Sequence, residues 1–152
     1  MAQHSYGVVP FRRVDGGVEL LIGHMGGPFW SRKDEGAWSF PKGLPEGDEE
    51  PLATARREMS EELGLPAPEG DYLPLGDVRQ SGGKVVTAWA VETDLDPADV
   101  VPGTFTMPWP PRSGREQEFP EVDRVAWVDP ATARRVLVKA QAAFVDRLLD
   151  LL

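Results

Sequence analysis

Apolar residues in this chain fall into short runs separated by glycine and proline, and most of these runs predict strands. Runs rich in Val, Leu, Ile and aromatic residues, bounded by turn-forming residues, are typical of strands. We expect strands at residues 5–12, 18–25, 37–40, 72–79, 84–92 and 123–128. Asp15-Gly16-Gly17 and Gly82-Gly83 predict turns, because glycine adopts the positive φ that tight turns need. Residues 102–120 are rich in proline and predict a long loop, which could hold one strand near Phe105.

Two segments carry apolar residues at helical spacing instead. Residues 49–63 place Leu52, Met59 and Leu63 on one stripe, which predicts a helix that docks on a sheet. Residues 130–151 predict two further helices, with apolar positions at Val136, Leu137, Phe144, Leu148 and Leu151. Because strands and helices are mixed without strict alternation, the pattern predicts an α+β fold, a mixed β-sheet flanked by helices.

Composition narrows the class of protein. A chain of 152 residues and 16.7 kDa is the size of one domain. No apolar run approaches the 18 residues or so that a membrane-spanning helix needs, so we expect no membrane partner. The N-terminal segment does not have the pattern of a secretory signal, and we expect a cytoplasmic protein. The absence of cysteine excludes a disulfide scaffold, a thiol nucleophile and a cysteine-based zinc site.

The charge balance narrows the range of partners. Sixteen Lys and Arg against 25 Asp and Glu give a formal net charge of -9. Binding to a nucleic-acid polymer depends on phosphate neutralisation by Lys and Arg, so such a partner is not expected. Small phosphorylated ligands are not excluded, because carboxylates can bind them through a divalent cation.

The helix at residues 49–63 carries the candidate chemistry. Asp48 is the expected N-cap, and the acidic Glu49 and Glu50 suit the positive end of the helix dipole. Gly64 is the expected C-terminal cap. Together these residues predict a helix with well-marked ends.

Glu58, Glu61 and Glu62 share one face of this helix. At 100° per residue, Glu61 and Glu62 lie about 60° and 40° to either side of Glu58. Like charges at such spacing repel each other, and a hard divalent cation such as Mg²⁺ would remove the conflict. The alternative is a solvated acidic face, which the carboxylates alone would favour.

The residues around these carboxylates resemble the Nudix box, G-x5-E-x7-R-E-U-x-E-E-x-G-U, where U is a bulky apolar residue. Every position of the pattern is filled, by Gly43, Glu49, Arg57, Glu58, Met59, Glu61, Glu62, Gly64 and Leu65. The arrangement of strands and helices around the box is also similar to the Nudix fold. The resemblance implies an α/β/α sandwich and a single Nudix hydrolase domain over residues 1–152.

The resemblance also implies roles for individual residues. Nudix proteins are mostly hydrolases of a nucleoside diphosphate linked to another group. Glu58, Glu61 and Glu62 would bind Mg²⁺ or Mn²⁺, and the backbone of Gly43 would face the metal. Glu49 and Arg57 would brace the loop and helix by an ion pair, with Gly64 as a structural position of the box.

The general base differs between Nudix subgroups and is sometimes a glutamate in a later loop. Pyrophosphate cleavage needs an activated water, and a carboxylate can accept its proton. Glu58 is the preferred base or shared ligand, and the later candidates are Glu116, Glu118 and Glu121, of which the last two are preferred. The proposed catalytic set is therefore Glu58, Glu61, Glu118 and Glu121. For each later glutamate, the alternative is an ordinary polar loop.

Residues 38–43, WSFPKG, resemble the W-x-x-P-K-G lead-in of Nudix members that act on dinucleoside and inositol polyphosphates. Lys42 could neutralise a phosphate. Phe29 or Trp30 could stack on a base, and Arg112 and Arg115 could contact phosphates. The alternatives are a surface lysine, core or loop anchors, and loop bracing. His4 and His24 have no partner at ligand spacing and are assigned no role.

The leading interpretation is a Mg²⁺-dependent hydrolase of a dinucleoside polyphosphate such as diadenosine tetraphosphate. A nucleoside triphosphate pyrophosphohydrolase is the alternative among enzymes. A non-catalytic nucleotide-binding Nudix domain is the alternative of another class, although such domains commonly lose box carboxylates and this chain keeps them. The expected partner is a small nucleotide, and the expected state is a monomer or homodimer.

Overall fold

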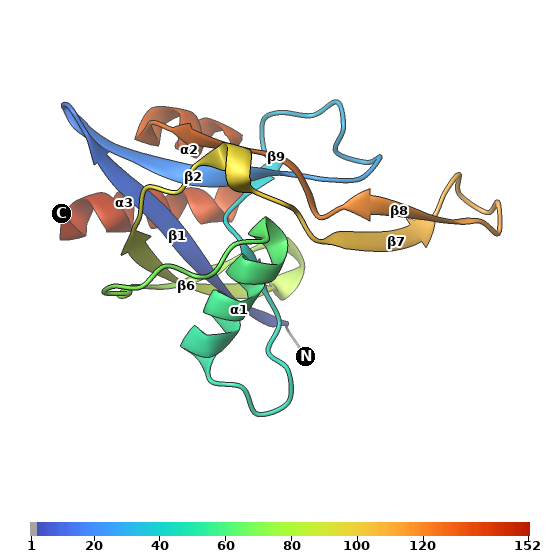
Figure 1. The fold of residues 1–152 in the computed structure, drawn as a ribbon, viewed down its shortest axis with the longest axis horizontal. Coiled ribbons are helices and arrows are strands. Elements are labelled where there is room, and N and C mark those ends of the chain that lie inside the picture. The colour runs from blue at the N-terminus through green and yellow to red at the C-terminus, as the bar shows by residue number, and fades with distance from the viewer. Residues whose placement is uncertain (1–2) are drawn as a thin grey trace.

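A mixed sheet forms the centre of the protein, seen in a computed structural model that describes residues 3–152 (Figure 1). Its strands are β1 (His4–Val14), β2 (Gly17–Met25), β3 (Trp38–Ser39), β4 (Lys42–Gly43), β5 (Leu73–Arg79), β6 (Val85–Glu92) and β9 (Val122–Val128). The order is β3-β2-β1-β6-β5, with β4 paired to β1 and β9 paired to β2. Only the β1–β6 pair among these is parallel, so the predicted mixed sheet is confirmed.

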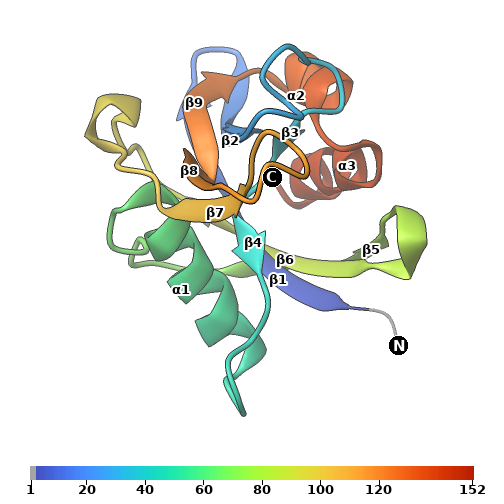
Figure 2. The ribbon, with the colours of Figure 1, turned by 90° about the vertical axis from the view of Figure 1, so that its right-hand side faces the viewer.

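Helices cover both faces of this sheet, as Figure 2 shows. Helix α1 (Pro51–Leu63) lies on one face, and α2 (Pro130–Val136) and α3 (Ala142–Leu151) lie on the other. Three single-turn 3-10 helices complete the structure: η1 (Ser81–Gly83), η2 (Pro97–Asp99) and η3 (Lys139–Gln141). The α+β prediction and its sandwich arrangement are confirmed. No helix of residues 3–152 is long and apolar enough to cross a membrane.

Neighbouring residues of β1 serve two separate cores, because side chains alternate across a strand. Val8 packs with Met59 and Leu63 of α1, whereas Val9 packs with Phe144 on the opposite face. The helix stripe predicted from Met59 and Leu63 is therefore buried against the sheet as expected. This packing sets the position of α1 relative to the sheet, and with it the position of the acidic face of the helix.

The start of α1 differs from the prediction. The N-cap is Glu50 and the helix begins at Pro51, so no acidic residue lies in its first turn. Proline favours the first helical position because it has no N–H to leave unpaired there. Asp48 and Glu49 precede the helix, and the Glu49 carboxylate is used elsewhere. At the other end Gly64 is the expected cap, with φ of 67°, and a Cβ there would collide with the carbonyl oxygen of Val101.

Residues 102–120 form a hairpin rather than the long loop predicted. Strands β7 (Thr104–Pro108) and β8 (Glu116–Pro120) pair antiparallel with Phe105 opposite Phe119. Figure 1 shows this hairpin projecting from the body of the protein. The strand expected near Phe105 is present, but β8 was missed. Proline is compatible with such edge strands, and here it stands at the end of each one.

Candidate active site

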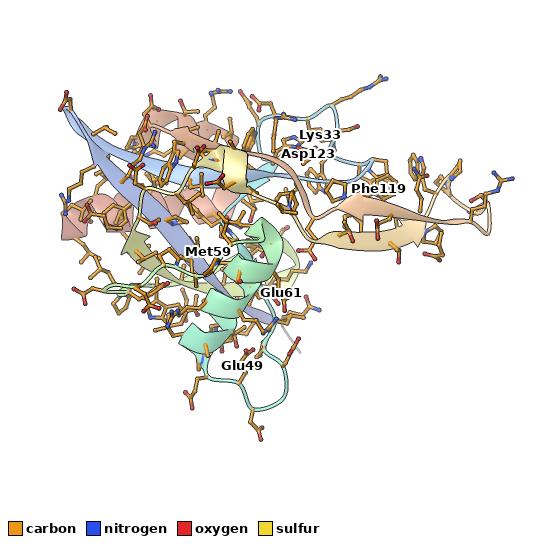
Figure 3. All side chains as sticks on the ribbon, in the orientation of Figure 1. Lys33, Glu49, Met59, Glu61, Phe119 and Asp123 are labelled. Atoms are coloured by element: carbon orange, nitrogen blue, oxygen red, sulfur yellow. The ribbon has the colours of Figure 1, made fainter. Side chains whose placement is uncertain are left out.

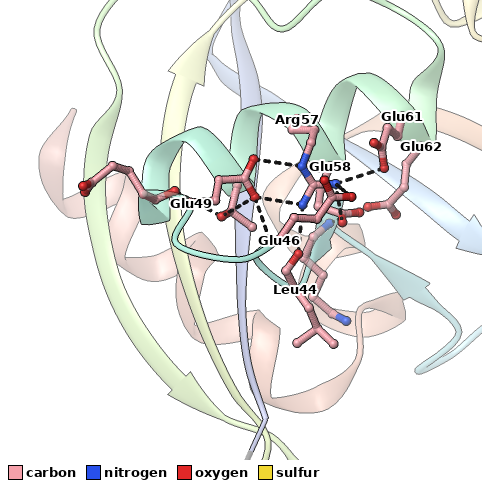
Figure 4. A network of polar contacts seen from close by, with 10 residues as sticks. Leu44, Glu46, Glu49, Arg57, Glu58, Glu61 and Glu62 are labelled. Carbon is pink, nitrogen blue, oxygen red and sulfur yellow. Dashed lines mark hydrogen bonds and ion pairs between the residues drawn. The ribbon is translucent and has the colours of Figure 1, made fainter.

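Arg57 organises the acidic face of α1 (Figure 4). Its Nε and Nη2 donate to the two oxygens of Glu49, at 2.9 and 3.0 Å. Its Nη1 donates to Glu58 at 3.0 Å and to Glu61 at 3.1 Å, and Nη2 also reaches the carbonyl of Leu44 at 2.9 Å. The hydrogen bond from Arg57 lowers the pKa of Glu49 to about 2. One guanidinium therefore joins the loop before the helix to two of the helix carboxylates.

Glycine is required at position 43 because the Glu58 side chain lies directly against its backbone. Strand β4 pairs with β1 so that Gly43 lies opposite Tyr6. A Cβ at this position would collide with the carboxylate of Glu58. Glu62 meets the same strand one residue earlier, where its Oε2 accepts the backbone N–H of Lys42 at 2.8 Å. Strand β4 is therefore in close contact with the carboxylates of Glu58 and Glu62.

The carboxylates here are partly desolvated and repel one another. The pKa of Glu62 is raised to about 8, mainly by burial and also by the charges of Glu121 and Glu58. Burial is also the main cause that raises the pKa of Glu58, which Arg57 opposes. The pKa of Glu121 is raised by burial and by the charge of Glu61. Glu58, Glu61, Glu62 and Glu121 therefore form one electrostatic cluster.

Glu121 is the later glutamate that joins this cluster. Its backbone N–H donates to the carbonyl of Gly103 at 2.8 Å, and its carbonyl accepts the N–H of Gly26 at 3.0 Å. Gly26 needs to be glycine, because a Cβ there would collide with the Pro120 carbonyl oxygen. A Cβ on Gly103 would lie 2.9 Å from the carbonyl oxygen of Glu61 and 3.5 Å from Oε1 of Glu121. Close backbone approach at these two glycines brings Glu121 to the end of α1.

The other two later glutamates are placed differently. Glu118 and Glu116 are exposed residues of β8, opposite Thr106 and Pro108 of the projecting hairpin. No hydrogen bond or ion pair links either side chain to α1 among the residues that the structure describes. The geometry therefore separates Glu121 from Glu118, which the sequence did not.

Within residues 3–152, no group of three or more His, Cys, Asp or Glu side chains is arranged around a common metal position. In this arrangement Arg57 engages Glu58 and Glu61, and the N–H of Lys42 engages Glu62. The donor chemistry nevertheless fits a hard divalent cation, which prefers carboxylate oxygens. A cation would also relieve the mutual repulsion that raises the pKa values of these groups.

Lys42 lies near two of the carboxylates, and Lys84 lies near Lys42. Burial lowers the pKa of Lys42; the charge of Lys84 lowers it further, and Glu62 and Glu58 raise it. Lys84 follows η1 and precedes β6, which runs parallel to β1. Sequence reasoning missed Lys84, because only the parallel pairing of β6 with β1 brings it near Lys42.

A groove of about 460 Å³ opens on the same side of the sheet as α3. It lies between the β5–β6 turn and η3, and Figure 2 shows that turn beneath α3. Its lining residues are Arg79, Gln80, Ser81, Val138, Lys139, Ala140 and Ala143. The lining contains two cations and no acidic residue, in a protein whose net charge is -9.

The aromatic and arginine candidates for substrate binding are not gathered at the carboxylates. Trp30 is partly buried against the core under α2 and α3. Phe29 is 60% exposed and meets Trp109 edge-to-face at 5.7 Å between ring centroids. Arg112 and Arg115 belong to the tip of the β7–β8 hairpin, which points away from α1 in Figure 1. Their predicted contact with substrate stays a prediction.

His24 has a structural role that the sequence did not reveal. The side chain is fully buried, with Nδ1 at 2.9 Å from Asp123 and Nε2 at 2.6 Å from the carbonyl of Lys33. Figure 3 shows Lys33 and Asp123 close together. The contact ties the loop at residues 26–36 to β9, two residues after Glu121. A partner 99 residues away leaves no local signal in the sequence.

Comparison with known proteins places this geometry in context. The family model described as NUDIX domain matches residues 1–149. A Caenorhabditis elegans Ap4A hydrolase, in a binary complex, is similar at a TM-score of 0.68 and 18% identity, covering 99% of this chain and 97% of that one. The NUDIX domain of Shewanella oneidensis NrtR, complexed with ADP ribose, is similar at 0.66 and 16%, covering 99% and 88%.

A third similar structure is RenU, a Nudix hydrolase from M. smegmatis. Its TM-score is 0.59 at 24% identity, covering 98% of this chain and 84% of that one. A search of curated proteins finds no significant match. At these identities the structural likeness establishes the fold, and the family model covers nearly the whole chain.

Proposed function

The chain belongs to the NUDIX domain family and is a Nudix-type pyrophosphohydrolase, and from this premise we propose that it hydrolyses a dinucleoside polyphosphate such as diadenosine tetraphosphate. The observation that carries the proposal is Lys42, which lies near Glu58 and Glu62 and has a second cation, Lys84, near it. Adjacent cations suit a substrate with several consecutive phosphates. The carboxylates suit the metal that such a reaction uses.

We assign Glu58, Glu61 and Glu62 as the ligands of Mg²⁺ or Mn²⁺, with the backbone of Gly43 facing the ion. When bound, such a cation neutralises phosphate charge and lowers the pKa of the attacking water. Arg57 positions Glu58 and Glu61 through its Nη1. Glu62 accepts a hydrogen bond from the N–H of Lys42, which fixes this carboxylate relative to strand β4.

Glu121 is the proposed general base, with Glu58 as the alternative base or shared ligand. A base must be able to accept a proton near neutral pH, and the pKa of Glu121 is raised by burial and by Glu61. The backbone bonds to Gly26 and Gly103 hold this side chain at the end of α1. Glu118 has no such placement and is not retained as a base.

The basic side of the site supports the choice of a long substrate. Lys42 and Lys84 would neutralise phosphates beyond the one attacked. A substrate with only one diphosphate would leave these cations unused.

A nucleoside triphosphate pyrophosphohydrolase is the second candidate. One similar protein is an Ap4A hydrolase and another is complexed with ADP ribose, and both of these compounds contain a pyrophosphate linkage. Nucleoside triphosphates also contain this linkage, so the carboxylate site suits them as well as it suits a dinucleoside polyphosphate. A non-catalytic nucleotide-binding domain is the third candidate, which the complete set of box carboxylates disfavours.

Product analysis tests the proposal. The protein with Mg²⁺ is offered diadenosine tetraphosphate and a panel of nucleoside triphosphates at equal concentration. We expect the dinucleotide to be cut fastest, to ATP and AMP. Faster release of diphosphate and a nucleoside monophosphate from triphosphates would favour the second candidate. Metal-dependent binding without any cleavage would favour the third.

A further inference from the structure

Gln141 is a fully buried polar residue that the reaction described above does not use. It is the last residue of η3, at the base of α3. Its Oε1 accepts the backbone N–H of Phe40 at 3.0 Å, two residues before Lys42. Its Nε2 donates to the Ser39 hydroxyl at 3.1 Å and to Oε1 of Gln80 at 2.9 Å. One buried amide thus connects β3, η3 and the β5–β6 turn.

The direction of both amides in this chain of bonds is determined by chemistry. A backbone N–H can only donate, so the Gln141 atom that faces Phe40 must be the oxygen. The Gln141 nitrogen then faces Gln80, and a nitrogen can only donate. The Gln80 atom that receives it must therefore be its oxygen. The Nε2 of Gln80 is left outside the buried chain of bonds.

Gln80 itself lines the groove between Arg79 and Lys139 and is only partly buried. Its Nε2 has no hydrogen-bond partner among residues 3–152, and it is not one of their enclosed unpaired atoms. An amide that could rotate freely would present its donor or its acceptor with similar ease. Here the buried network holds the donor outward, in a lining that already carries two cations and no carboxylate.

We propose that Gln80 is a phosphate-binding residue that donates its Nε2 hydrogens to an anionic phosphate oxygen in this groove, and that Gln141 is the positioning residue that sets its direction. The groove opens on the α3 face of the sheet, whereas α1 and its carboxylates lie on the other face, so this phosphate site is separate from the carboxylate cluster. A phosphate oxygen is favoured over a base acceptor because the neighbouring side chains Arg79 and Lys139 are cationic.

The test is an equilibrium binding measurement on the full chain without divalent metal, with inorganic tripolyphosphate and adenosine as separate probes. Gln80→Leu removes the donor without adding charge, and a hydrogen bond to a charged group contributes about a tenfold or larger factor in affinity. We expect that loss for tripolyphosphate and no change for adenosine. Ser81→Ala, in the same lining, is the matched control and should stay within about twofold.

Gln141→Met tests the positioning role. It frees the Gln80 amide to rotate, and fixing a side chain again on binding costs about a two- to tenfold factor in affinity. Gln141→Met should weaken tripolyphosphate binding by this factor when Gln80 is present. It should have no further effect when it is combined with Gln80→Leu. An equal loss in both backgrounds would mean that Gln141 acts only through general structure, and would overturn its assignment.

Two further outcomes would overturn the Gln80 assignment. Tripolyphosphate affinity unchanged in Gln80→Leu would exclude the contact, and a loss confined to adenosine would assign Gln80 to a base instead. Gln80 is a partly exposed residue, so its variant stays interpretable if Gln141→Met fails to fold, which its melting temperature would reveal. Because no turnover is measured, failure of the hydrolase proposal on diadenosine tetraphosphate would be seen separately in product analysis.

Discussion

The two sides of the candidate site are held together in different ways. The acidic side is braced by one guanidinium, Arg57, whose partners lie within 13 residues of it in the chain. The basic side is held by neutral bonds of long range, such as Gln141 to Phe40 and Gln80, across 101 and 61 residues. We infer that the acidic side carries the chemistry and the basic side carries recognition of the substrate.

The difference predicts separable kinetic effects. Changes on the acidic side remove interactions that matter in the transition state and should lower kcat. Changes on the basic side remove binding that substrate and transition state share, and should raise KM. Four predictions follow this division, from the largest effect to the smallest.

Glu62→Gln should have the largest effect. Gln keeps an oxygen that can accept the N–H of Lys42, so the fold should be retained while a charged ligand is lost. Mutation of a residue that only hydrogen-bonds a metal ligand typically lowers activity by roughly 10- to 100-fold, and we expect the rate of metal-dependent hydrolysis to fall by more than this. The measurements are kcat with saturating Mg²⁺ and the melting temperature. Full activity in this variant would contradict the metal assignment.

Glu121→Gln and Glu118→Gln form a matched pair of carboxylate changes. Loss of a general base lowers kcat by about 10²- to 10⁴-fold, and we expect this for Glu121. Glu118 lies exposed on β8, so its variant should keep kcat within about twofold. Steady-state rates at saturating substrate compare the two. The reverse order would move the base to the hairpin and break the division of the site.

Lys42→Ala and Lys84→Ala should act on the basic side. The first removes a cation near the carboxylates and the second removes a cation near Lys42, and we expect KM for diadenosine tetraphosphate to rise about tenfold in each with kcat changed little. KM for a substrate with a single diphosphate should rise less. KM values for long and short substrates, measured in parallel, check this. Equal increases on both would remove the main support for a long polyphosphate.

The metal-free protein should lose stability as pH rises, which is the smallest of the expected effects. The folded-state pKa of Glu62 is about 8, above its ordinary value near 4.5, so the folded protein binds the extra proton. The contribution of this proton to the free energy of unfolding is fully present below pH about 4.5 and is lost as pH rises through about 8. Melting temperatures in a chelator should therefore fall across this window, and less so in Glu62→Gln. Added Mg²⁺ should restore most stability at the alkaline end. A melting temperature independent of pH would argue against the desolvated carboxylate.

Local patterns explain what could be predicted from the sequence. The i, i+3, i+4 spacing of Glu58, Glu61 and Glu62 sets their common face, and Gly64 sets the end of α1. The predicted beginning of the helix was wrong by two residues, because Pro51 at the first helical position outweighs the capping ability of Asp48. The partner of Glu49 was expected correctly as Arg57, since the box spacing brings them together.

Long-range pairing explains what could not be predicted. Lys84 reaches Lys42 only because β6 runs parallel to β1. The choice between Glu118 and Glu121 depends on where β8 ends and on two glycines that allow close backbone approach. The proline content of residues 102–120 concealed a hairpin, because prolines at strand ends leave the β7–β8 ladder intact.

Binding of diadenosine tetraphosphate to the Glu121→Gln protein tests the division most directly. Slow turnover in this variant permits an equilibrium measurement with Mg²⁺ present, and Lys42→Ala combined with Glu121→Gln provides the comparison. We predict that Glu121→Gln binds the dinucleotide as tightly as the parent protein or more tightly, because only a repelling carboxylate is lost. The combined variant should bind about tenfold more weakly. A tenfold loss from Glu121→Gln alone would contradict the account, because the acidic side would then take part in recognition.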